Sequence, residues 1–101
     1  MQQHTDALEA WVDEGIRLSH ASGYHPTVFI AMRQRHGTVG AMEKLVTSGH
    51  IQSGFVQLKR LGLAKEWSVE SGVIKFHDRF SHDARDSAQF RLDHIDDEEL
   101  R

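Results

Sequence analysis

Apolar residues recur every three or four positions along most of the chain, a spacing typical of helices that bury one face. Leu8, Val12 and Ile16 follow this spacing in the first segment. Thr5 suits the N-cap position in front of them, and Gly23 suits the end of the helix, because glycine accepts the left-handed backbone common there. The pattern therefore predicts a first helix between residues 5 and 23.

Residues 24 to 64 predict three further short helices, because apolar stripes alternate there with glycines. Proline fits the first position of a helix, where its missing N–H needs no partner. Threonine and serine are good N-caps, and glycine commonly follows the last turn. The expected starts are Pro26, Thr38 and Ser53, and the expected ends are Gly37, Gly49 and Gly62.

Residues 63 to 76 are compatible with two interpretations. Two short apolar runs flank a Ser-Gly pair, as in the arms of a β-hairpin. A helix fits better, because Ser68 is a good N-cap, Glu70 suits the first turn, and apolar residues recur at helical spacing. Gly72 is the weak point of this prediction, since glycine destabilises a helix interior.

A last helix is predicted after Ser81, with Ala84, Ala88 and Leu92 on a narrow apolar face. Residues 96 to 101 are mostly acidic and are expected to form a frayed tail. We therefore expect one all-α domain over residues 1 to 95, a compact bundle of five or six short helices. The alternative is a winged helix-turn-helix with a small hairpin at residues 63 to 76.

The composition fits a single domain, since 101 residues with 39% hydrophobic content bury a modest core. The chain has no cysteine, which excludes disulfides and thiolate chemistry. It has neither a signal-like N-terminus nor an apolar run of roughly eighteen residues, so we expect a cytoplasmic protein that does not span a membrane. The residues expected in the core are Trp11, Phe29, Leu45, Phe55, Leu58 and Val73.

The net charge of −3 hides a segregation along the chain. Residues 1 to 23 carry four acids against one base, residues 24 to 65 carry six bases against one acid, and residues 66 to 101 carry ten acids against five bases. A basic middle between acidic ends suggests electrostatic recognition. The residues expected to contact a partner are Arg33, Arg35, Gln57, Lys59, Arg60 and Lys65.

The chain offers little that resembles a catalytic or metal site. It has eight histidines, but no two are four residues apart as in helical zinc sites. The run HDRFSHD has two His-Asp pairs, as in some metal-dependent phosphohydrolases, without the further ligands they need. His82 and Asp86 are expected to pair on a helix surface. We therefore expect no enzymatic activity, metal, cofactor or small-molecule substrate.

A pattern of spaced residues from Tyr24 to Leu92 resembles a small helical domain of uncharacterised function, found alone or fused in many bacterial proteins. The resemblance implies a helical fold at residues 68 to 76, and no known ligand. Gly72 and Arg85 depart from it, since apolar residues are expected there. The residues that carry it are Tyr24, Pro26, Phe29, Gly37, Ala41, Ser53, Gly54, Phe55, Leu58, Gly62, Leu63, Ser68, Val69, Glu70, Ala88 and Leu92.

These features favour a non-catalytic interaction module that binds a protein partner, or another copy of itself, through the basic middle of the chain and its acidic ends. Nucleic-acid binding is the alternative. A helix-turn-helix with its turn at Gly49 places Phe55 and Leu58 at core positions. It also places Leu45 where a small residue is usual, so the fit to this motif is partial.

Overall fold

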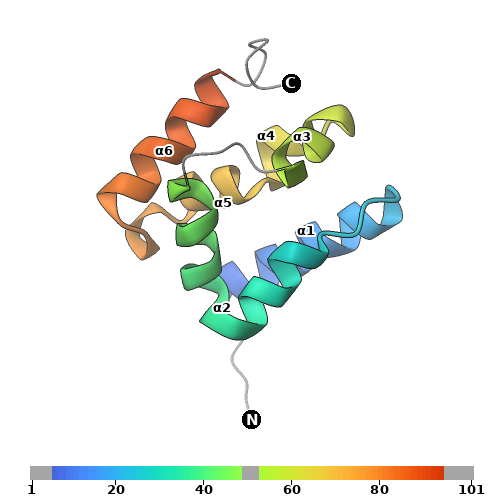
Figure 1. Cartoon of the computed structure of the whole chain (residues 1–101), viewed down its shortest axis with the longest axis horizontal. Coiled ribbons are helices and arrows are strands. Elements are labelled where there is room, and N and C mark those ends of the chain that lie inside the picture. The colour runs from blue at the N-terminus through green and yellow to red at the C-terminus, as the bar shows by residue number, and fades with distance from the viewer. Residues whose placement is uncertain (1–5, 49–52, 95–101) are drawn as a thin grey trace.

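The computed structural model describes residues 6–48 and 53–94, and every regular element in these ranges is helical (Figure 1). The prediction of an all-α fold is confirmed. The hairpin alternative is wrong, because helices occupy most of residues 63 to 76. No helix in the described ranges is long and apolar enough to cross a membrane. The elements are α1 (Ala7–Ala21), α2 (Thr27–Thr47), α3 (Ser53–Arg60), α4 (Ala64–Trp67), α5 (Val69–Lys75), a 3-10 helix (His77–Arg79) and α6 (His82–Asp93).

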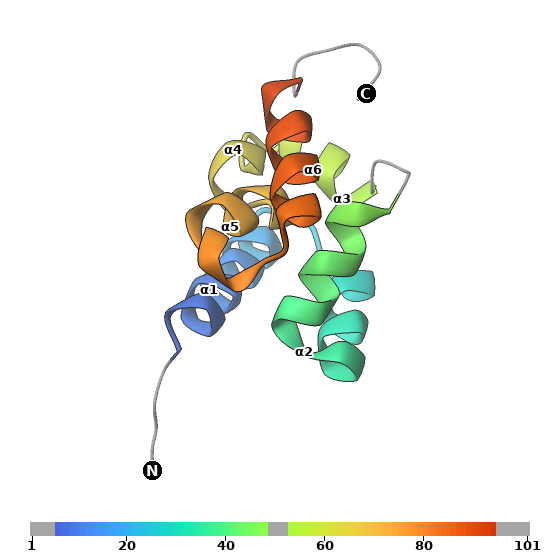
Figure 2. The ribbon, with the colours of Figure 1, turned by 90° about the vertical axis from the view of Figure 1, so that its left-hand side faces the viewer.

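Helix α5 lies at the centre of the arrangement and packs against α1, α2, α4 and α6. Figure 2 shows α5 between α1 and α6, with the second half of α2 beside α6. Helices α3 and α4 form a smaller unit at the edge of the bundle (Figure 1). The short helices predicted from the sequence are therefore held together by one central helix of seven residues.

Side-chain caps set the starts of three helices. Ser68 Oγ accepts a hydrogen bond from the Ser71 N–H at 3.1 Å, as predicted for the start of α5. Ser81 Oγ likewise accepts from the Ala84 N–H at 3.1 Å at the start of α6. Asp6 caps α1, one residue later than the predicted Thr5, which lies outside the described residues. The position of a cap fixes the first turn of each helix.

Helix α2 contains the break that was predicted at Gly37. Gly37 adopts φ 81° and ψ 168°, a conformation that favours glycine, and it divides α2 into two straight halves. Thr38 was expected to cap the second half, but its hydroxyl is engaged in another way. Its Oγ1 donates to the Glu9 carboxylate at 2.6 Å and accepts from Arg33 Nε at 2.9 Å. The kink therefore brings Thr38 onto α1.

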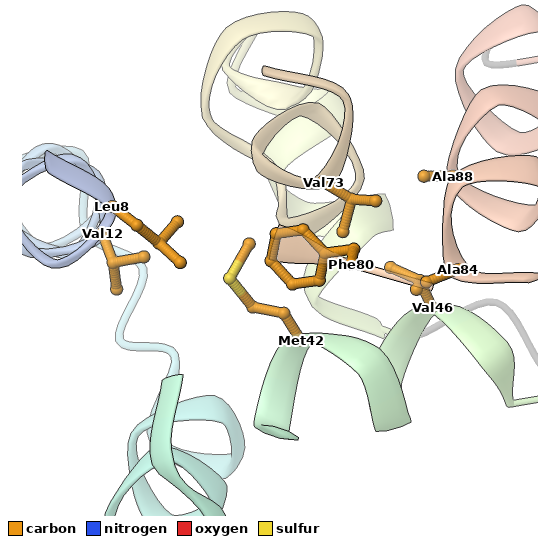
Figure 3. Packing of buried hydrophobic residues seen from close by; sticks show 8 residues of the cluster. All are labelled: Leu8, Val12, Met42, Val46, Val73, Phe80, Ala84 and Ala88. Atoms are coloured by element: carbon orange, nitrogen blue, oxygen red, sulfur yellow. The ribbon is translucent and has the colours of Figure 1, made fainter. Parts of the chain in front are cut away.

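The main core lies between α1, α2, α5 and α6 (Figure 3). A smaller cluster of Phe55, Leu58 and Ala64 lies under α3 and α4. Among the predicted core residues, all but two are buried. Trp11 and Phe29 are partly exposed, because both line a cavity. The main core consists of Leu8, Val12, Met42, Val46, Val73, Phe80, Ala84 and Ala88.

Gly72, the weak point of the sequence prediction, is a position of close helix approach. A Cβ atom at this position would lie 2.5 Å from the Trp11 ring and 2.7 Å from Met42 Cε. Such distances are far below van der Waals contact, so glycine allows Trp11 to pack directly on the backbone of α5. The Trp11 ring also stacks on Trp67, with ring centroids 5.4 Å apart.

Candidate functional site

The six residues expected to contact a partner fall into two groups that lie apart. Arg33 and Arg35 are on α2 just before its kink, whereas Gln57, Lys59, Arg60 and Lys65 are on or beside α3 and α4. Figures 1 and 2 place the kink of α2 and the α3–α4 unit at different ends of the molecule. The predicted basic surface is therefore not one continuous patch.

Arg33 is engaged within the chain. Its guanidinium forms ion pairs with Glu9 at 2.5 Å and Asp13 at 2.8 Å, both on α1. Burial lowers the pKa of Arg33, but its hydrogen bonds to the Glu9 and Asp13 carboxylates outweigh this effect and raise the pKa overall. Arg33 therefore joins α2 to α1. Arg35, two residues on, is exposed.

The remaining four residues form what we call the α3–α4 basic surface, defined as Gln57, Lys59, Arg60 and Lys65. Lys59 is half-exposed and the others are exposed. Within the described residues, none of its three cations forms an ion pair. Between residues 57 and 66 the chain has a single acid, Glu66. The surface therefore presents positive charge to the solvent.

A cavity of about 240 Å³ lies between α1, the start of α2, α3 and the junction of α4 with α5. This cavity was not predicted from the sequence. Its walls are mainly apolar and aromatic, and both tryptophans of the chain line it. Most of the residues that line it have apolar side chains, which is the usual character of small-molecule sites. The aromatic residues that line it are Trp11, Tyr24, Phe29, Phe55 and Trp67.

Few polar groups line this cavity. Ser19 Oγ donates to the Gly15 carbonyl at 2.9 Å and is satisfied. The hydroxyl of Ser68, whose residue is 0% exposed, accepts a hydrogen bond but donates none to the described residues. The phenol of Tyr24 has no hydrogen-bond partner in the described residues, and burial raises its pKa. The Thr27 hydroxyl also lacks an acceptor in the described residues, so three hydroxyl protons of the lining have none there. Ser68 is the one of the three that exposes no surface to the cavity.

Glu70 lies behind the cavity and is 3% exposed. Its Oε2 accepts a hydrogen bond at 2.9 Å from Nη1 of the buried Arg91 on α6. Arg91 also donates to the carbonyls of Leu45 and Ser48 at the end of α2, at 3.1 and 2.9 Å. Burial raises the pKa of Glu70, although Arg91 acts in the opposite direction. This arrangement connects α2, α5 and α6.

The Glu70–Arg91 pair was not predicted from the sequence. Glu70 was expected in the first turn of a helix because of the helix dipole, and the last helix was expected to have an apolar face ending at Leu92. A signal was present, since residues 84, 88 and 91 share one helical stripe. Arg91 is buried on this stripe, whereas Leu92 is only partly buried.

The histidines do not gather into a metal site in the part of the chain that the structure describes. No group of three or more metal-binding side chains lies together in residues 6–48 and 53–94. His20 and His25 have ring centroids 4.6 Å apart at the end of α1 and the loop that follows it. His82 and Asp86 form the predicted surface pair at 3.4 Å.

Comparisons of the chain with models of protein families, with curated proteins and with solved structures found no match. The resemblance to a small helical bacterial domain therefore stays a prediction. The structure defines a class of fold, a small all-α bundle, and the functional proposal depends on its own surfaces.

Proposed function

We propose that this protein is a non-catalytic interaction module that binds an acidic segment of a protein partner through the α3–α4 basic surface. The observation that carries this proposal is that three cations without an ion pair in the described residues lie together on two short neighbouring helices. Arg17, Arg33, Arg79 and Arg91 each form an ion pair with a carboxylate of the same chain. Lys59, Arg60 and Lys65 form none within the described residues.

Unpaired surface cations attract an acidic partner over a distance of about 8 to 10 Å at physiological salt. They raise the rate of association and select against basic partners. Leu61, which is 38% exposed, directly follows Arg60 and adds an apolar contact at the same surface. A partner that combines carboxylates with an apolar side chain therefore matches the surface best.

A charge-reversal variant tests the proposal. Lys59→Glu/Arg60→Glu inverts the charge of the surface, and Lys44→Glu/Lys75→Glu changes the net charge by the same amount at exposed positions on α2 and α5. The probe is a fluorescent peptide rich in aspartate and glutamate with one leucine, titrated at about 50 and 200 mM salt. We expect binding that weakens with salt and falls at least about tenfold in the first variant, with little change in the second.

Equal loss in both variants would show that only net charge matters and would refute the α3–α4 basic surface as the site. Absence of peptide binding at low salt would refute the proposal as a whole.

Nucleic-acid binding is the alternative that the same titrations decide. Its winged form is excluded by the helices at residues 64 to 75, but unpaired cations also attract phosphates. Tighter binding of duplex or single-stranded DNA than of the acidic peptide, with steeper salt dependence, would put the alternative first.

Sedimentation of the protein alone tests whether the partner is a second copy.

A cytoplasmic location belongs to the proposal, since a chain without cysteine needs no oxidising compartment.

A further inference from the structure

The cavity between α1, α2, α3 and α5 has the dimensions of a site for a small molecule. An apolar protein cavity of about 150 Å³ holds one benzene ring. A volume of about 240 Å³ therefore accommodates about ten heavy atoms, the size of a substituted or fused aromatic ring. This cavity is independent of the α3–α4 basic surface, whose charged groups do not line it.

The walls of the cavity favour a planar ring. Five of the residues that line it are aromatic, and aromatic rings pack well in offset or edge-to-face contact with a further ring. Trp11 and Phe29 remain partly exposed although both pack against the main core. Their exposed surface faces a space that the chain itself leaves unfilled among the described residues. A bound ring would remove this apolar surface from water.

The polar groups of the cavity favour a hydrogen-bond acceptor on the ligand. Tyr24 is partly buried, and its phenol proton has no acceptor among the described residues. A buried donor without a partner is uncommon and calls for a bound molecule or water. The Thr27 hydroxyl at the same cavity is a second donor without a protein acceptor in those residues. A carbonyl or ether oxygen on the ligand would satisfy such donors.

The charges around the cavity favour a neutral ligand. No lysine or arginine is among the described residues that line it, so an anion would lose hydration without gaining a strong counter-charge. Glu70 lines the cavity as well, but its carboxylate already pairs with Arg91, whose positive charge opposes the entry of a cation.

We propose that this cavity binds a neutral aromatic molecule of about ten heavy atoms that carries a carbonyl or ether oxygen. The ring lies against the tryptophan and phenylalanine side chains, and the oxygen accepts a hydrogen bond from Tyr24.

Four isosteric probes test the proposal on the wild-type protein. Acetophenone is neutral with an acceptor, cumene is neutral without one, benzoate is an anion and benzamidine is a cation. Heteronuclear NMR of nitrogen-labelled protein follows each titration through the amide signals and the two indole N–H signals of Trp11 and Trp67. We expect acetophenone to bind with Kd on the order of 1 mM or tighter. Cumene should bind about fivefold more weakly, and benzoate and benzamidine at least about tenfold more weakly.

The location of binding is tested by filling the cavity. Val69→Phe places a ring in the cavity from the first turn of α5, whereas Ile74→Phe makes a comparable change on the same helix away from it. We expect Val69→Phe to abolish acetophenone binding and Ile74→Phe to retain it. If Val69→Phe does not fold, the wild-type shift map decides, because the shifts must centre on both indole signals and the residues that line the cavity.

Three results would overturn the inference. Failure of all four probes to bind would show that the cavity takes no ligand of this size. Equal or tighter binding of cumene would remove the role of the hydroxyl donors, and tighter binding of either ion would refute the neutral class. Failure of the probes to bind the cavity would not affect the peptide titration that tests the proposed function, because the α3–α4 basic surface does not line the cavity.

Discussion

The α5–α6 region and the α3–α4 region of this small bundle are built in different ways. Both helices of the first begin with a serine cap, and their shared core is fully buried at Val73, Ala84 and Ala88. In the second, a cluster of three buried residues supports α3 and α4, and no side chain caps α4. Its cations face the solvent. The first region therefore holds most of the caps and buried contacts, whereas the second presents three cations that form no ion pair among the described residues.

Breaking the Glu70–Arg91 pair should have the largest effect of the variants considered. Arg91→Ala leaves the buried Glu70 carboxylate without its partner and removes one hydrogen bond each from the Leu45 and Ser48 carbonyls. Loss of one partner of a buried ion pair costs about 3 to 5 kcal/mol of unfolding free energy. Denaturation in urea measures this change in the free energy of unfolding. Arg85→Ala, a half-exposed arginine of the same helix, should change stability by less than about 0.5 kcal/mol. Similar values for the two variants would contradict a structural role for the pair.

Phe55→Ala examines the smaller cluster. Removal of a buried phenylalanine costs about 3 to 5 kcal/mol, and we expect a value near the lower limit because few buried residues surround this ring. The control is Phe90→Ala, since Phe90 is 59% exposed and its loss should cost less than about 1 kcal/mol. A cost below about 1 kcal/mol for Phe55→Ala would show that α3 contributes little to the folded core.

Gly72→Ala should destabilise the protein by about 1 to 3 kcal/mol, because the new methyl group overlaps the Trp11 ring and Met42 Cε. Helix propensity alone predicts the opposite sign, a gain of about 1 kcal/mol. Gly40→Ala is the matched control, since the nearest side-chain atom there is Cβ of the exposed His36 at 3.2 Å. Thermal unfolding of the two variants in parallel compares them. An increase in Tm for both would refute the close approach of α5 to Trp11.

The smallest expected effect is the pH dependence that Glu70 confers. Burial raises its pKa in the folded state above the ordinary value of 4.5, so the folded protein binds this proton more tightly than the unfolded chain. The contribution is present below pH 4.5 and is lost as pH rises through the folded-state pKa. Glu70→Gln cannot titrate. The stability of wild type minus that of this variant should therefore fall as the pH rises above about 4.5. A rise over this range would mean that the ion pair outweighs burial.

The sequence predicted the local structure well, because local rules govern it. Apolar spacing located the described helices except the four-residue α4 and the 3-10 helix. Ser68 and Ser81 cap their helices as expected, and the break at Gly37 was correctly placed. These features depend on neighbours a few residues apart. The hairpin alternative failed because a capped, periodic segment satisfied its own backbone as a helix.

The contacts between helices could not be predicted in the same way. Gly72 was interpreted as a weak point because helix propensity depends only on the helix itself. Glycine is favoured at this position because the Trp11 ring of another helix packs against it. Arg33 was expected on an exposed surface, but it pairs with α1, since the kink turns its half of α2 toward Glu9 and Asp13. The cavity likewise results from how four helices meet. Spacing along one helix does not determine such distances.

The contacts of Arg91 also bear on how the chain is made. A ribosome releases the N-terminal part first, so Glu70 emerges 21 residues, and Leu45 46 residues, before the arginine that pairs with them. Until α6 has emerged from the ribosome, the nascent chain carries an acid and helix-end carbonyls that cannot be buried without a cost in free energy. We therefore expect the earlier helices to form first and the core to close only once α6 is available. A chain that stalls before residue 91 should remain open to chaperones and proteases.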